Sequence, residues 1–66
     1  MRKINEVFVN GVCLEEILKE HKIWLNNEGG ERANLMGVDL SNVDLSNVNL
    51  RNANLTDTNL RCANLT

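Results

Sequence analysis

Aromatic residues are nearly absent from this sequence of 66 residues, in which Phe8 and Trp24 are the only two. Base-stacking surfaces and an ordinary aromatic core are therefore largely excluded. The net charge of −2 is too small for a basic nucleic-acid-binding domain or for a disordered acidic tail. A chain of this size buries only about 60% of the surface that its unfolded form exposes, so its stability needs a source besides a large core.

Few residues are available for covalent, metal or catalytic chemistry. The two cysteines, Cys13 and Cys62, allow at most one disulfide, which does not suit an oxidised secreted scaffold. His21 is the only histidine, and without a set of paired ligands or a triad partner it is best interpreted as a packed core residue. No apolar run is long enough to cross a bilayer. We expect a soluble, cytoplasmic protein with no catalytic residue, no metal and no cofactor, in which Cys62 is a free thiol at a solvent position.

Leucine recurs at every fifth position through more than half of the chain. The leucines are Leu35, Leu40, Leu45, Leu50, Leu55, Leu60 and Leu65, each preceded by Asn or Asp and, one position earlier, by a small or β-branched residue. An α-helix would spread these leucines around all of its faces, and a strand would place them alternately on two faces. A chain that turns about a right angle after each unit keeps every leucine inside, so that four units make one coil.

A coil of four units predicts that position i stacks on position i+20, at the strand spacing of about 4.8 Å. The expected inner columns pair Leu35 with Leu55, Leu40 with Leu60, and Leu45 with Leu65. The expected outer columns pair Asn34 with Asn54, Asp39 with Asn59, and Asp44 with Asn64.

This pattern resembles the pentapeptide-repeat family, whose signature is Ala, Asp or Asn, Leu, and two variable residues. The resemblance covers residues 33–66 and implies a β-solenoid, specifically a right-handed quadrilateral β-helix of under two coils. It also implies that each leucine and the residue two before it point inward, a rule from which Thr58 departs mildly.

Residues 1–30 are predicted to form an N-terminal strand and an amphipathic capping helix, which make one domain with the repeat region at residues 31–66. The apolar residues of positions 14–25 fall within an arc of about 120° on a helix. Residues 7–9, followed by Asn10 and Gly11, predict a short strand that pairs along the first coil. Gly29 and Gly30 permit the turn from the helix into the coil. This segment looks like the entry segment of small pentapeptide-repeat proteins, including ones carried by bacteriophages.

An uncapped, leucine-lined edge on the last coil favours association with a second chain. We therefore expect a homodimer through the C-terminal end, which the resemblance also implies. Its interface residues are Leu50, Leu60, Leu65 and Thr66. A candidate partner surface consists of two apolar residues expected to be exposed and three carboxylates: Ile23, Met36, Asp39, Asp44 and Asp57.

The leading hypothesis is a non-enzymatic protein-binding module, a dimeric rod that inhibits a larger protein such as a host nucleic-acid enzyme or defence factor, without direct contact to nucleic acid or membrane. A strict DNA mimic is one alternative, because some members of the resembling family imitate duplex DNA toward DNA gyrase. Residues 31–66 contain four acidic and three basic residues, a net of −1, and form no acidic stripe. The other alternative is a structural repeat fragment without a target.

Overall fold

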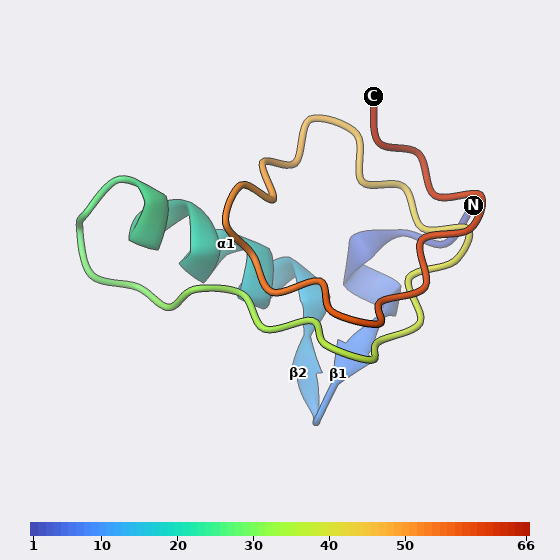
Figure 1. The fold of residues 1–66 in the computed structure, drawn as a ribbon, viewed down its shortest axis with the longest axis horizontal. Coiled ribbons are helices and arrows are strands. Elements are labelled where there is room, and N and C mark those ends of the chain that lie inside the picture. Colours follow the sequence, from blue (N-terminus) through green and yellow to red (C-terminus); the bar gives the residue numbers. More distant parts are fainter.

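The computed structural model describes all residues, 1–66, with extents of 31 × 25 × 21 Å. Its elements in chain order are the 3₁₀ helix η1 (Ile4–Glu6), strands β1 (Phe8–Val9) and β2 (Val12–Cys13), and helix α1 (Leu14–Leu25). Residues 31–66 then wind as a coil beside these elements (Figure 1). No helix of the structure is long and apolar enough to cross a membrane.

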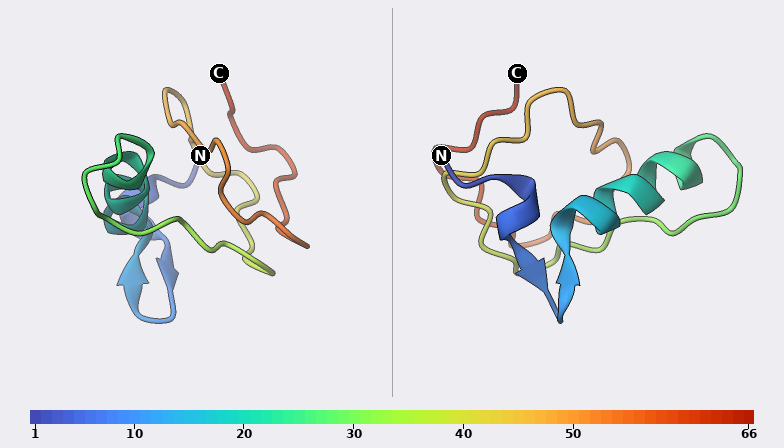
Figure 2. Two further views of the ribbon diagram at one scale, coloured as in Figure 1. Left: turned by 60° about the vertical axis from the view of Figure 1, so that its left-hand side comes forward. Right: turned by 180° about the vertical axis from the view of Figure 1, so that it is seen from behind.

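β1 and β2 form an antiparallel hairpin, in which Phe8 pairs with Cys13 and Val9 with Val12. Asn10 and Gly11 have positive φ angles of 52° and 83°, as in the two-residue turns that match the twist of paired strands. The predicted strand is present, but its predicted pairing along the first coil is wrong. The tight turn closes β1 onto the residues that follow it directly, and the hairpin projects beside the coil (Figure 2).

The N-terminal segment, instead of the hairpin, extends the coil by pairing. Arg2 forms a parallel bridge with Val43. Its N–H donates to the carbonyl of Asn42 at 2.7 Å, and its carbonyl accepts from the N–H of Asp44 at 2.8 Å. Arg2 thereby satisfies, on one side, backbone groups that a preceding coil would satisfy in a longer solenoid.

Helix α1 has the bounds that its apolar spacing predicts, and it buries Leu14, Leu18 and His21. It ends at Leu25 and is capped by Asn26, whose N–H donates to the carbonyls of Lys22 and Ile23 at 3.2 Å. Directly after the helix, a left-handed asparagine turns the chain, since Asn27 has φ 59°. The helix therefore stops before the two glycines are reached.

Gly30 allows the loop that follows α1 to pack closely against the helix. It has φ 69°, and a Cβ at this position would lie 2.5 Å from the carbonyl oxygen of Glu20 and 2.9 Å from the Cβ of Ile23. Any other residue would force the loop off the helix. This close approach leaves Ile23 half-buried, although its place on the helical wheel suggests an exposed side chain.

The first six of the seven five-residue units end in the same hydrogen-bonded turn. The carbonyl of each leucine from Leu35 to Leu60 accepts from the N–H three residues later, at 3.0–3.2 Å. The third residue of each turn has a positive φ, between 57° and 71°, which is the backbone that a type II turn requires. These residues are Gly37, Asn42, Asn47, Asn52, Asp57 and Cys62. Gly, Asn and Asp tolerate this conformation, which explains the polar residues at this position of the repeat.

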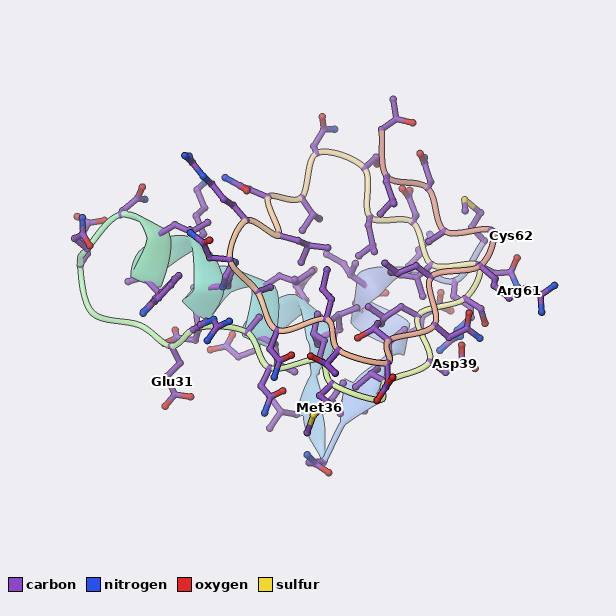
Figure 3. The ribbon with its side chains drawn as sticks, viewed as in Figure 1. Glu31, Met36, Asp39, Arg61 and Cys62 are labelled. Carbon is purple, nitrogen blue, oxygen red and sulfur yellow. The ribbon has the colours of Figure 1, made fainter.

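The two coils stack with the predicted offset of twenty residues. Parallel bridges join Asn34 to Asn54, Asp39 to Asn59, and Asp44 to Asn64. The N–H groups of Leu35, Leu40 and Leu45 donate to the carbonyls of the coil above at 2.8–2.9 Å. The predicted register is therefore confirmed. The labelled side chains of the repeat region in Figure 3 project outward, away from this stack.

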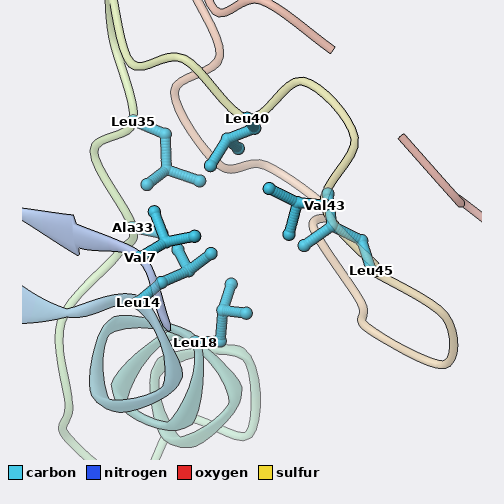
Figure 4. Packing of buried hydrophobic residues seen from close by; sticks show 8 residues of the cluster. All are labelled: Val7, Leu14, Leu18, Ala33, Leu35, Leu40, Val43 and Leu45. Atoms are coloured by element: carbon cyan, nitrogen blue, oxygen red, sulfur yellow. The ribbon is translucent and has the colours of Figure 1, made fainter. Parts of the chain in front are cut away.

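We call the first coil, which contains Leu35 to Leu50, the lower coil, and the second, which contains Leu55 to Leu65, the upper coil. One hydrophobic cluster lies between α1 and the lower coil (Figure 4). Its buried members are Val7, Leu14, Leu18, Ala33, Leu35, Leu40, Val43 and Leu45. Burial decreases from the lower coil to the upper one: Leu45 is 1% exposed, whereas Leu65, in the position above it, is 59% exposed. The helix and the N-terminal segment thus cover one end of the coil and leave the other end open.

Candidate functional site

The Asn or Asp before each leucine forms a hydrogen bond with its own turn. In all seven units its Oδ1 accepts from the backbone N–H two residues later, at 2.9–3.2 Å. This short side-chain bond is the Asx turn, which stabilises the corner locally. The sequence analysis places these side chains outside but misses this role. The spacing of Asn or Asp two positions before a turn residue is the signal that could have revealed it.

Some of these side chains also bond between the coils. The Nδ2 of Asn54 donates to Oδ1 of Asn34 at 3.3 Å, and the Nδ2 of Asn64 donates to Oδ1 of Asp44 at 3.3 Å. The outward columns are therefore ordered polar ladders, presented on a regular backbone.

Two carboxylates of these columns are held in the ionised form. Hydrogen bonds from the Ser41 side chain and backbone N–H lower the pKa of Asp39, and the nearby Arg2 guanidinium adds to the effect. The closest Arg2–Asp39 nitrogen–oxygen distance is 4.0 Å. For Asp44, hydrogen bonds from the side chain and backbone N–H of Ser46 lower the pKa. Both aspartates therefore carry their charge at neutral pH.

Three of the residues predicted for the dimer interface, Leu60, Leu65 and Thr66, lie in the upper coil, and Leu50 is the last leucine of the lower coil. Leu50 and Leu60 are half-buried, and Leu65 and Thr66 are exposed. Backbone groups are unpaired there as well. The N–H groups of Leu60 and Leu65 have no backbone acceptor, although their counterparts in the coil below do. The upper rim thus combines apolar surface with free hydrogen-bonding groups.

Comparison with protein families matches residues 33–66, which is half of the chain, to the family described as pentapeptide repeats, in eight copies. The chain belongs to the pentapeptide-repeat family. This family forms β-solenoid folds, and its members are generally non-enzymatic structural or binding modules. Searches of curated proteins and of solved structures found no match.

The pentapeptide coil brings together only part of the candidate partner surface. Met36 and Asp39 line one groove between the coil and the hairpin. Asp44 borders a different groove, beside η1, and Asp57 is exposed at a corner of the upper coil. Ile23 lies against the loop that leaves α1. The five residues therefore do not form a single surface.

His21 links the capping helix to both coils of the pentapeptide repeat. It is fully buried, its Nδ1 accepts from the backbone N–H of Ala33 at 3.0 Å, and its Nε2 lies 2.8 Å from the carbonyl oxygen of Arg51. Since Nδ1 is an acceptor, Nε2 carries the proton and donates to Arg51. The predicted core role of His21 is confirmed, and both ring nitrogens are occupied by structural hydrogen bonds.

Thr58 shows how the pentapeptide pattern tolerates a polar residue at an inward position. Its hydroxyl donates to the carbonyl oxygen of Leu35, in the coil below, at 2.6 Å. The hydroxyl is therefore satisfied inside the coil, a contact that becomes visible only once the register is known.

The two cysteines do not form a disulfide. Both are free thiols; Cys13 is half-buried and its Sγ approaches the carbonyl of Ile4 at 3.8 Å, while Cys62 is exposed at a corner of the upper coil. The prediction of a free, solvent-facing thiol at Cys62 is confirmed.

Proposed function

We propose that this pentapeptide-repeat chain is a cytoplasmic, non-enzymatic protein-binding module. In this proposal two copies stack through their C-terminal coils into a rod, which docks onto a larger protein and inhibits it. More specifically, we propose a phage-encoded inhibitor whose target is a host nucleic-acid enzyme or defence factor. The observation that carries the proposal is the contrast between the covered and the open end of the coil.

The open end supports pairing with a second copy. Leu65 is 59% exposed, and the upper coil presents unpaired N–H groups in the positions that bond between coils lower down. Exposed strand edges and exposed apolar surface both favour association. A two-fold pairing would use the same surface on each copy, so every contact occurs twice.

The shape proposed for the rod is a right-handed quadrilateral β-helix of under two coils. Turns recur every five residues, and backbone bridges recur every twenty. These two periods support four sides per coil. A rod with flat, polar sides suits docking by shape onto a rigid partner surface.

Two properties of the side chains support a binding role. The outward Asn and Asp residues hold their own turns, and His21 is occupied between the helix and the coils. A catalytic acid or base needs a polar group free to meet a substrate. Strict DNA mimicry is less favoured, because it needs an array of free carboxylates, whereas Asp39 lies beside Arg2.

Replacing Leu65 with aspartate tests the dimer. Burying one leucine contributes about 1.5–3 kcal/mol, and the two copies of the change should together weaken dimerisation by about 10²-fold or more. Sedimentation equilibrium of Leu65→Asp is expected to report monomers where the wild type is dimeric. The control is Asn47→Asp, which adds the same charge at a turn position equivalent to that of Asp57, where the chain already has an aspartate. A dimeric Leu65→Asp variant, or a monomeric wild type, would refute stacking through this end.

The inhibitor role is tested with the same two variants in a bacterial lysate. A saturable partner should be retained by the wild type, and its activity should fall as the protein is added. Mimicry of DNA predicts that the complex dissociates at high salt and when Asp39, Asp44 and Asp57 are all changed to asparagine. No saturable partner under these conditions would leave only the structural-fragment interpretation.

A further inference from the structure

Two adjoining grooves run along the β1–β2 hairpin. The first, of about 270 Å³, separates the hairpin from α1 and the start of the coil. The second, of about 470 Å³, separates the hairpin from the coil at residues 34–39. Val9, Asn10 and Asn34 line both grooves, so the two adjoin along the hairpin. We call the combined depression, formed by the hairpin, residues 16–20 of α1 and residues 31–39, the hairpin trough.

The hairpin trough concentrates exposed apolar side chains. The chain has five large hydrophobic residues that are exposed, and three of them line the trough: Phe8 at 64%, Met36 at 56% and Val12 at 45%. Phe8 and Met36 line the same groove, one from the hairpin and one from the first corner of the coil. A pair of exposed apolar side chains on opposite walls of a groove is the arrangement that receives an apolar anchor of a partner.

Charge in the trough is strongly unequal. Glu16, Glu20 and Glu31 line the first groove, and Asp39 lines the second. Arg32 is the one basic residue that lines either groove, which gives the trough a net charge of −3, against −2 for the whole chain. The Nε of Arg32 donates to the carbonyl of Asn52 in the upper coil. Arg2, outside the trough, lies 4.0 Å from Asp39, so the acidic charge without an ion-pair partner is that of the three glutamates in the first groove.

We propose that the hairpin trough binds an extended segment of a partner protein that carries an apolar side chain followed or preceded by lysine or arginine. The apolar side chain lies between Phe8 and Met36. The aliphatic stem of the basic residue packs against Val12, and its cationic group lies among the glutamates of the first groove. This inference rests on the proposed function as a binding module and specifies which surface receives the partner and what chemistry the partner presents.

The test uses a display library of random dodecapeptides, selected on the wild-type protein. The selected peptides are synthesised, and their affinities are measured by titration calorimetry. One variant combines Glu16→Gln, Glu20→Gln and Glu31→Gln. Its matched control combines Glu6→Gln, Glu15→Gln and Glu28→Gln, three exposed glutamates outside the trough. A second variant, Phe8→Ser with Met36→Ser, removes the apolar walls. Circular dichroism verifies that all variants remain folded.

The expected peptides contain lysine or arginine together with an apolar residue. Their affinity should fall at least tenfold on the triple trough variant and on the Phe8→Ser/Met36→Ser variant, and should stay unchanged on the triple control. Peptides that bind equally well to the trough variants would overturn the trough and leave the binding module standing. A selection that recovers no more peptide on the wild type than on the triple trough variant would also overturn it. Peptides that convert the wild-type dimer to monomer would show that a second copy occupies the trough, contrary to the proposal.

Dimerisation is scored separately by the Leu65→Asp experiment. Failure of the trough and failure of the stacked rod are therefore distinguishable, because the trough and the upper rim share no residue.

Discussion

Replacing His21 with leucine should remove the two hydrogen bonds that join α1 to the coils. The Ala33 N–H is buried, and leaving it without an acceptor costs about 1–3 kcal/mol. The Arg51 carbonyl is only partly buried, so its loss is limited to the net value of one hydrogen bond, about 0.5–1.5 kcal/mol. The sum, about 1.5–4.5 kcal/mol, is large beside a total stability of about 3–10 kcal/mol for a chain of this length.

Urea denaturation followed by circular dichroism measures this loss as a lower midpoint. Fluorescence of Trp24 reports the same region, because its ring stacks on His21 with centroids 5.6 Å apart. The control Lys22→Leu makes the same residue on the exposed face of α1. If His21→Leu unfolds at the same urea concentration as this control, His21 does not join the cap to the coils and the reasoning fails.

Two further changes test the corners of the coil. Cys62→Asn should stabilise the protein by about 0.5–1 kcal/mol, because Asn tolerates the left-handed backbone (φ 61°) that other side chains adopt at a cost. Thermal denaturation measures the gain. An equal gain for Cys62→Ala would mean that removal of the thiol, and not the backbone conformation, is responsible. Changing Asp39 and Asp44 together to asparagine should reduce the loss of stability at acidic pH. In the wild type a lowered pKa of each aspartate in the folded state adds stability above about pH 4, and this stability is lost as the pH falls further. Urea midpoints between pH 7 and pH 2 measure this, with Asp57→Asn as the control, and an unchanged slope in the double variant would contradict it.

The repeat register and the helix could be predicted because each follows from a period. Leucine at every fifth position favours an arrangement that turns all seven side chains toward one interior, and this arrangement leads directly to the Asn34–Asn54 bridge. The apolar spacing of α1 likewise indicates its bounds, since the apolar stripe begins at Leu14 and ends at Leu25.

Contacts between segments of different kinds could not be predicted in this way. The pairing of Arg2 with Val43 joins the N-terminus to the coil across forty residues, and no local pattern marks it. The turn at Asn10 follows from the sequence, but the sequence does not indicate whether the strand before it pairs with β2 or with the coil. Met36 and Asp39 come together with Phe8 only because the hairpin projects beside the first corner. The repeat pattern therefore places Met36 and Asp39 on the coil but does not place them beside Phe8.

The uniform corners give this small protein a simple rule of orientation. Each Asn or Asp before a leucine bonds to its own turn, so every corner is stabilised locally and in the same way. Twenty residues bring the chain back beside itself, and each five residues add one corner. The number of repeats therefore determines in which direction the last unit of the upper rim points relative to the hairpin, and each added repeat changes this direction by one corner.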